Sequence, residues 1–159
     1  PAGRLDYRSE GLLLLSNDGK FIHRVTHPDH EFPKTYLAQV EGEVTTNALF
    51  QLNREIVLPG FQTRKGEAKI IDPPAIPERS KPVRDYHPTT WLQIRLWEGK
   101  KHQVRKMTAA VGYPTLRLVR IAIGPVTLGN TSPGNWRELS DDELRGLKVP
   151  PKFIPGNEG

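Results

Sequence analysis

The feature that most constrains the fold is an alternating strand pattern that runs directly into an amphipathic helix pattern. Residues 89–98 alternate between two faces, as a strand requires. The apolar face is formed by Leu92, Ile94 and Leu96, and the other by Trp91, Gln93, Arg95 and Trp97. Residues 101–111 then have helical periodicity, carried by Val104, Met107, Thr108 and Val111 and ended by Gly112. The chain therefore combines a sheet with at least one packed helix.

The remaining patterns add more strands than helices. Further strands are expected over Leu12–Ser16, Lys34–Val40, Gly66–Asp72 and within Leu116–Leu128. Short helices are expected over Lys20–Thr26, from Thr45 or Thr46 to about Asn53, and over Asp141–Leu147 after the cap Ser140. Because the order lacks a regular β-α-β rhythm, we predict an α+β fold with a mixed, mainly antiparallel sheet and flanking helices.

Length and composition limit the class of protein. The 159 residues suggest one domain, which we place at residues 1–149, followed by a Pro- and Gly-rich tail at 150–159 that we expect to be disordered. No apolar run approaches the roughly 20 residues that span a bilayer, so we expect no membrane association and a cytoplasmic location. The absence of cysteine excludes disulfides and thiolate metal sites. The first residue is Pro1, so we expect that part of the native N-terminus is missing.

Positive charge is concentrated in one part of the sequence. Residues 99–137 contain seven Lys and Arg residues and no Asp or Glu, whereas the formal net charge of the chain is +5, so the rest carries −2. Such a block indicates either a polyanion-binding surface or a solvated helix face. A second basic segment, with Arg79, Lys81 and Arg84 among prolines, could lie along a phosphate backbone or be mobile.

Several residues are candidates for chemistry, each with a plainer alternative. Asp6 precedes an apolar segment and is either a partly buried carboxylate or an exposed turn residue. Tyr36 is either a platform for an unstacked base or a packing residue. Arg105 either points inward as a permanent cation or belongs to a solvated face with His102 and Lys106. The residues His23, His27, Asp29 and His30 do not have metal-ligand spacing, so we predict no metal site.

Four segments together resemble the pseudouridine synthases of the branch named for the ribosomal small-subunit enzyme RsuA. They are GRLDYRSEGLLLLSNDG (3–19), KTYLAQVEG (34–42), LWEGKKHQVRKMTAAVGYPTLRLVRIAIG (96–124) and WREL (136–139). The third segment, and the proline-rich loop before it, are most similar to a subgroup that modifies large-subunit RNA.

The resemblance implies a fold, a site and a reaction. The sheet would bend into two merged lobes with RNA between them, and no cofactor or metal would be needed. Asp6 would be catalytic, while Tyr36, Arg105 and Leu118 would contact the target base or Asp6. We also expect six basic residues to bind RNA, namely Lys100, Lys101, His102, Lys106, Arg117 and Arg120.

The expected function is therefore isomerisation of a uridine in ribosomal RNA, of the 23S class, to pseudouridine by a monomeric enzyme. One alternative is a non-catalytic RNA-binding or assembly module on the same scaffold. Another is a retaining glycosidase that uses Asp6 and Glu10, but a basic block suits an oligosaccharide poorly. Whether Asp6 acts as nucleophile, base or electrostatic partner is left open by the sequence.

Overall fold

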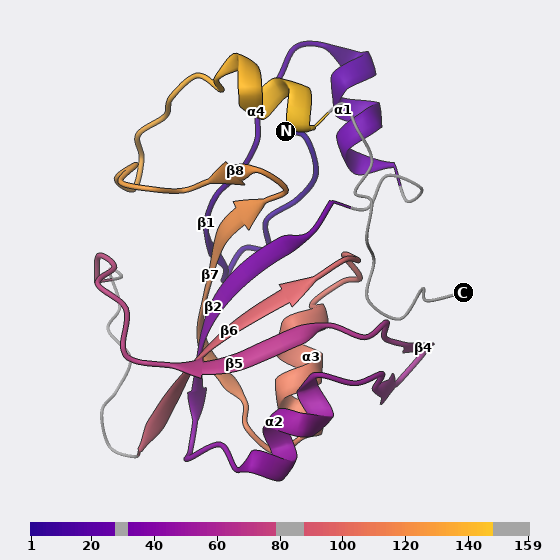
Figure 1. Ribbon diagram of the computed structural model, residues 1–159, viewed down its shortest axis with the longest axis vertical. Coiled ribbons are helices and arrows are strands. Elements are labelled where there is room, and N and C mark those ends of the chain that lie inside the picture. Colours follow the sequence, from indigo (N-terminus) through magenta and orange to yellow (C-terminus); the bar gives the residue numbers. More distant parts are fainter. Residues whose placement is uncertain (28–31, 79–87, 148–159) are drawn as a thin grey trace.

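The computed structural model describes residues 1–27, 32–78 and 88–147, which form a bent sheet with helices at both ends (Figure 1). The main sheet has the strand order β1-β7-β2-β6-β5, and β8 pairs with the end of β7. Its strands are β1 (Glu10–Gly11), β2 (Lys34–Glu41), β5 (Glu67–Ile71), β6 (Thr89–Leu96), β7 (Thr115–Ile123) and β8 (Val126–Thr127). Only the β1–β7 pair is parallel in this sheet. The prediction of an α+β fold with a mixed, mainly antiparallel sheet is confirmed.

The helices follow the sequence patterns closely. They are α1 (Gly19–Thr26), α2 (Thr46–Leu52), α3 (Gln103–Ala110) and α4 (Asp141–Gly146), and a small hairpin joins β3 (Val57–Leu58) to β4 (Phe61–Gln62). Thr45 caps α2 through its side chain, and Ser140 forms a capping box with Glu143 on α4. The expected cap residues therefore set the starts of both helices.

The prediction of a strand over Leu12–Ser16 is wrong. The strand β1 covers only Glu10–Gly11, and the chain leaves the sheet at Gly11, where φ is +106°. A Cβ at Gly11 would lie 2.2 Å from the carbonyl oxygen of Arg120, so only glycine fits this close approach. Beyond it, Leu14 turns into the interior, and its carbonyl accepts a hydrogen bond from the Ala2 amide at 2.8 Å.

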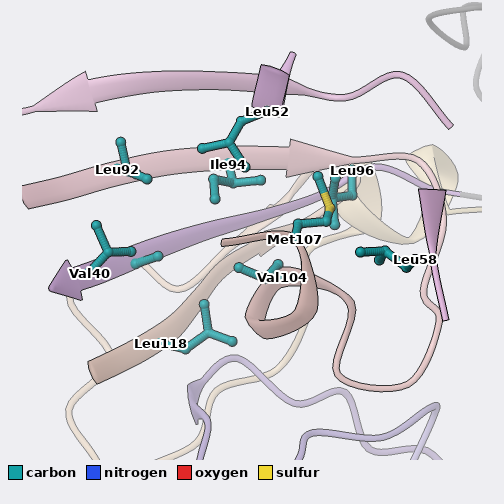
Figure 2. Packing of buried hydrophobic residues seen from close by; sticks show 10 residues of the cluster. Val40, Leu52, Leu58, Leu92, Ile94, Leu96, Val104, Met107 and Leu118 are labelled. Carbon is teal, nitrogen blue, oxygen red and sulfur yellow. The ribbon is translucent and has the colours of Figure 1, made fainter. Parts of the chain in front are cut away.

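Two hydrophobic cores lie along β7. The larger core joins β2, β6 and β7 to α2 and α3, and its side chains meet as shown in Figure 2. The smaller core joins the far end of β7 to α1, α4 and β8. Leu118 belongs to the first core and Ile123 to the second. The part of β7 between them therefore lies where the two cores meet.

Some sequence predictions fall on residues that the structure does not describe. These are the basic loop residues Arg79, Lys81 and Arg84, the residues Asp29 and His30, and the tail at 150–159. The division into one domain at 1–149 and a tail stays a prediction. In the described ranges, no helix has the length and apolar character that crossing a membrane requires.

Candidate functional site

Asp6 lies in a turn that neighbouring elements hold in place. The turn is closed by the Ser9 amide, which donates to the Asp6 carbonyl at 2.8 Å. Two residues before Asp6, the Arg4 carbonyl accepts a hydrogen bond from Arg120 at 3.0 Å. The Asp6 side chain is 26% exposed, so a substrate can reach it. The carboxylate is thus partly covered, and its backbone is anchored to β7.

His102 approaches this carboxylate from the start of α3. Its Nδ1 lies 3.2 Å from Asp6 Oδ2, which is an ion pair when the imidazole is protonated. His102 is the N-cap of α3 and has φ +53°, the only positive φ of a non-glycine residue in the described ranges. This left-handed conformation costs roughly 1–2 kcal/mol for an L-residue. The residue that contacts the Asp6 carboxylate is therefore also the one whose backbone is strained.

Arg105, three residues further along α3, reaches the same turn. Its Nη2 donates to the Arg8 carbonyl at 3.1 Å, and its Nη1 lies 3.4 Å from the Thr115 carbonyl. A guanidinium from α3 therefore connects the turn that carries Asp6 to the start of β7. The structure brings Arg105 to the turn that carries Asp6, and its expected role as the partner of the Asp6 carboxylate stays a prediction.

Tyr36 and Arg120 face each other across the centre of the sheet. They are cross-strand partners in the β2–β7 register, and Arg120 hydrogen-bonds to the phenol. Burial raises the pKa of Tyr36 above its ordinary value, against the lowering effects of the Arg120 charge and hydrogen bond, and the nearby negative charge of Asp6 raises it further. The phenol is therefore protonated at neutral pH.

Arg117 and Arg120 are not on the RNA-facing surface where the sequence analysis placed them. They are 8% and 4% exposed, respectively. Arg117 makes two hydrogen bonds of 2.8 Å to Glu10, and Arg120 donates to the carbonyls of Leu12 and Arg4. Both arginines therefore fasten the N-terminal segment to β7.

The other expected residues divide between core and surface. Leu118 is buried in the larger core. Lys100 and Lys101 are exposed at the loop before α3, while Lys106 is partly buried, with its amino group 5.6 Å from the centre of the Phe61 ring. The positively charged surface is therefore smaller than the basic block at residues 99–137 suggested, and it lies around the start of α3.

Arg120 is the site residue whose role the sequence analysis missed. It was expected to contact RNA phosphates, but it supports Tyr36 and the segment before Asp6. A local signal existed, because the arginine interrupts the apolar run Leu118–Ile123 of a strand. Arginine is almost never fully buried unless it is paired, so an arginine within an apolar run indicates that a buried partner should be sought.

The arrangement is suited to chemistry at a flat, charged or polarised group. A carboxylate can stabilise positive charge, a protonated phenol with its ring can hold a planar group, and nearby cations can bind phosphate. Among the described residues, no three His, Cys, Asp or Glu side chains are placed to hold a metal ion. Glu10 is engaged by Arg117 through both carboxylate oxygens, which does not favour the glycosidase alternative.

Comparison with known proteins gives one consistent family. The sequence family described as RNA pseudouridylate synthase matches residues 1–110. The chain is 46% identical to the "Ribosomal large subunit pseudouridine synthase E" of Vibrio parahaemolyticus, over 87% of this chain and 59% of that protein. It is 48% identical to the protein of the same name from Xanthomonas campestris pv. campestris, over 92% of this chain and 79% of that protein. The chain thus spans about three fifths of the Vibrio relative.

A solved structure extends the likeness to three dimensions. It is described as "Crystal structure of pseudouridylate synthase" and superposes with a TM-score of 0.77 at 32% identity. The match covers 92% of this chain and 58% of that one. The likeness therefore includes both cores and the strands that carry the candidate site.

Proposed function

This chain belongs to the RNA pseudouridylate synthase family, and on that premise we propose that it converts a uridine of large-subunit ribosomal RNA to pseudouridine. The choice of large-subunit (23S) RNA is supported by the names of the Vibrio and Xanthomonas relatives. We further propose that the protein acts as a monomer in the cytoplasm. The observation that carries the proposal is the partly exposed Asp6 carboxylate, which contacts His102 and lies in a segment that Arg105 and Arg120 anchor.

The reaction breaks the bond between uracil N1 and ribose C1′, turns the detached base, and joins C5 to C1′. All atoms are retained apart from the proton at C5, which is exchanged for one at N1. Positive charge develops at the ribose while negative charge develops on uracil, so the site must stabilise both. It must also exclude water that would hydrolyse the sugar intermediate.

Asp6 is the proposed catalytic carboxylate. It supplies negative charge at the ribose, and its partial exposure leaves a path for the nucleotide. Arg105 is proposed as its basic partner, since the guanidinium holds the turn that carries Asp6. Lysine could not replace Arg105, because it lacks the planar pair of donors that reaches two carbonyls at once.

Tyr36 is proposed to hold the plane of the uracil. Its ring is fixed by the sheet and by Arg120, so little side-chain freedom is lost when the base binds. Leu118, on the neighbouring strand β7, is buried in the core against which Tyr36 also packs, and we propose that it lines the inner side of the site. Together they occupy space that water would otherwise fill, and this protects the detached base.

The target nucleotide must leave its stack to reach this site, which costs roughly a few kcal/mol. The exposed cations Lys100 and Lys101, with His102 and Lys106, are proposed to offset this cost through phosphate contacts. RNA affinity should then fall steeply as salt rises. RNA affinity that stays constant between low and moderate ionic strength would contradict these phosphate contacts.

The experiment that tests the function uses unmodified transcripts of 23S and 16S RNA labelled with tritium at uracil C5. Tritium is released when the new bond forms at C5, and mapping then locates the product. We expect release from the 23S transcript at one position and none from 16S. A protein that binds the 23S transcript but releases no tritium would instead be the non-catalytic module.

A further inference from the structure

Tyr7, the residue after Asp6, is a large aromatic side chain left entirely in water. It is 101% exposed, more than any other large hydrophobic side chain in the described ranges. A tyrosine in this position contributes no buried area to the fold. It is therefore free to contribute contact area to whatever approaches Asp6.

The backbone beneath Tyr7 is fixed although its ring is free. Tyr7 and Arg8 occupy the two central positions of the turn that the Ser9 amide closes on Asp6. Arg105 holds the Arg8 carbonyl from α3. A tyrosine has two side-chain torsions, so ordering its ring on a rigid turn costs little conformational entropy.

The surroundings of Tyr7 suit nucleic acid rather than an apolar partner. Arg4 and Arg8 are both exposed on the same short segment, so two cations lie near Tyr7 in the chain. Aromatic rings with neighbouring cations are the combination that binds unpaired bases and their phosphates. An apolar protein surface would leave both guanidinium groups without compensation.

The proposed reaction leaves one base of the RNA without a stacking partner, and the Tyr7 ring can supply one. When the target uridine turns out of its stack toward Asp6, the base beside it loses a stacking partner. Tyr7 is adjacent to Asp6 in the chain, so its ring is within reach of that neighbouring base. Resting on the proposed function, we propose that Tyr7 stacks on the base next to the extruded uridine and stabilises the opened strand as a positioning residue.

The test compares three variants at Tyr7 with the wild type, using tritium release from the 23S transcript. Base stacking is worth about 1–3 kcal/mol, so Tyr7→Ala should lower kcat/KM by about 5- to 150-fold. Tyr7→Phe keeps the ring and should stay within about twofold of the wild type, whereas Tyr7→Leu keeps apolar area without a ring and should resemble Tyr7→Ala. Trp136→Ala, which removes an exposed aromatic ring from the loop after β8, is the matched control and should leave kcat/KM unchanged.

Thermal unfolding and sedimentation of the same variants complete the test. All Tyr7 variants should have the same Tm as the wild type, because the Tyr7 ring is outside the core. Given an active wild type, the inference is overturned if Tyr7→Ala has the wild-type kcat/KM. It is also overturned if Tyr7→Leu has the same kcat/KM as Tyr7→Phe, or if Tyr7→Phe loses as much kcat/KM as Tyr7→Ala. A change in self-association with unchanged kcat/KM would also overturn it and identify a protein contact. A wild-type protein that modifies no transcript refutes the proposed function itself.

Discussion

Substitution of Arg120 tests most clearly whether this buried cation supports the fold or binds RNA. Replacing it with methionine keeps much of the side-chain volume but removes the guanidinium. In the structure this group is 4% exposed and donates to the carbonyls of Leu12 and Arg4 at 2.9 and 3.0 Å. It also hydrogen-bonds to the Tyr36 phenol. Arg120→Met therefore leaves two carbonyls and one phenol without this donor.

The expected loss of stability follows from these contacts. Hydrogen bonds from a charged group are worth about 1.5–3 kcal/mol each, so losing the two bonds to carbonyls should lower the unfolding free energy by about 3 kcal/mol or more. At about 2–4 °C per kcal/mol for a chain of this size, Tm should fall by about 6–12 °C. Release of the Arg4 carbonyl should also displace the Asp6 turn, and a 1 Å displacement can lower kcat about 10²-fold.

Thermal denaturation and salt-dependent RNA binding are the assays for Arg120→Met. Lys101→Met is the matched control, since Lys101 is an exposed cation of the same charged block. The Tm of the Lys101→Met control should lie within a few degrees of the wild-type Tm. This substitution should reduce the slope of log RNA affinity against log salt concentration by about 1. An Arg120→Met protein that melts like the wild type but loses that unit of salt slope would refute the structural role.

Two further predictions concern local structure. His102 has φ +53°, so His102→Gly should be more stable to denaturant than His102→Ala by about 1 kcal/mol, and equal stability would contradict the left-handed conformation. The hydrogen bonds from Arg137 and the Ser140 amide lower the pKa of Glu143 to about 2 from its ordinary 4.5. Glu143 thus stabilises the fold above about pH 4.5, and this contribution is lost as the pH falls toward 2. Glu143→Gln should flatten the fall in Tm between pH 5 and 2; parallel Tm curves would contradict the capping role.

Local periodicity made a large part of the fold predictable. The strand β6 and the helix α3 were expected from alternation and from helical spacing, and Leu92, Ile94, Val104 and Met107 are buried as those patterns require. The failure at Leu12–Ser16 has a different origin. The chain turns away after Gly11, whose positive φ and close approach to the Arg120 carbonyl admit only glycine, and a contact between residues far apart in sequence leaves no local pattern.

Candidate residues for the site could be named from the sequence, but their arrangement could not. Asp6, Tyr36 and Arg105 were each candidates, while the pairing of Tyr36 with Arg120 depends on the register between β2 and β7. Charge counting could not separate Arg117 and Arg120 from the exposed lysines, because a sum of charges contains no information on which face each side chain occupies. The partners of the two arginines in the N-terminal segment, Glu10, Leu12 and Arg4, decide that question, and these contacts join residues far apart in sequence.

The central claim is that the Asp6 carboxylate performs the chemistry, and a pair of isosteric variants tests it directly. Asp6→Asn removes the negative charge, while Asp18→Asn makes the same change at the N-cap of α1, where asparagine is an equally good cap. Under single-turnover conditions on the 23S transcript, we expect Asp6→Asn to lower the rate of tritium release about 10⁴-fold with RNA affinity retained. Asp18→Asn should match the wild type. Tritium release by Asp6→Asn at the rate of Asp18→Asn would contradict the account.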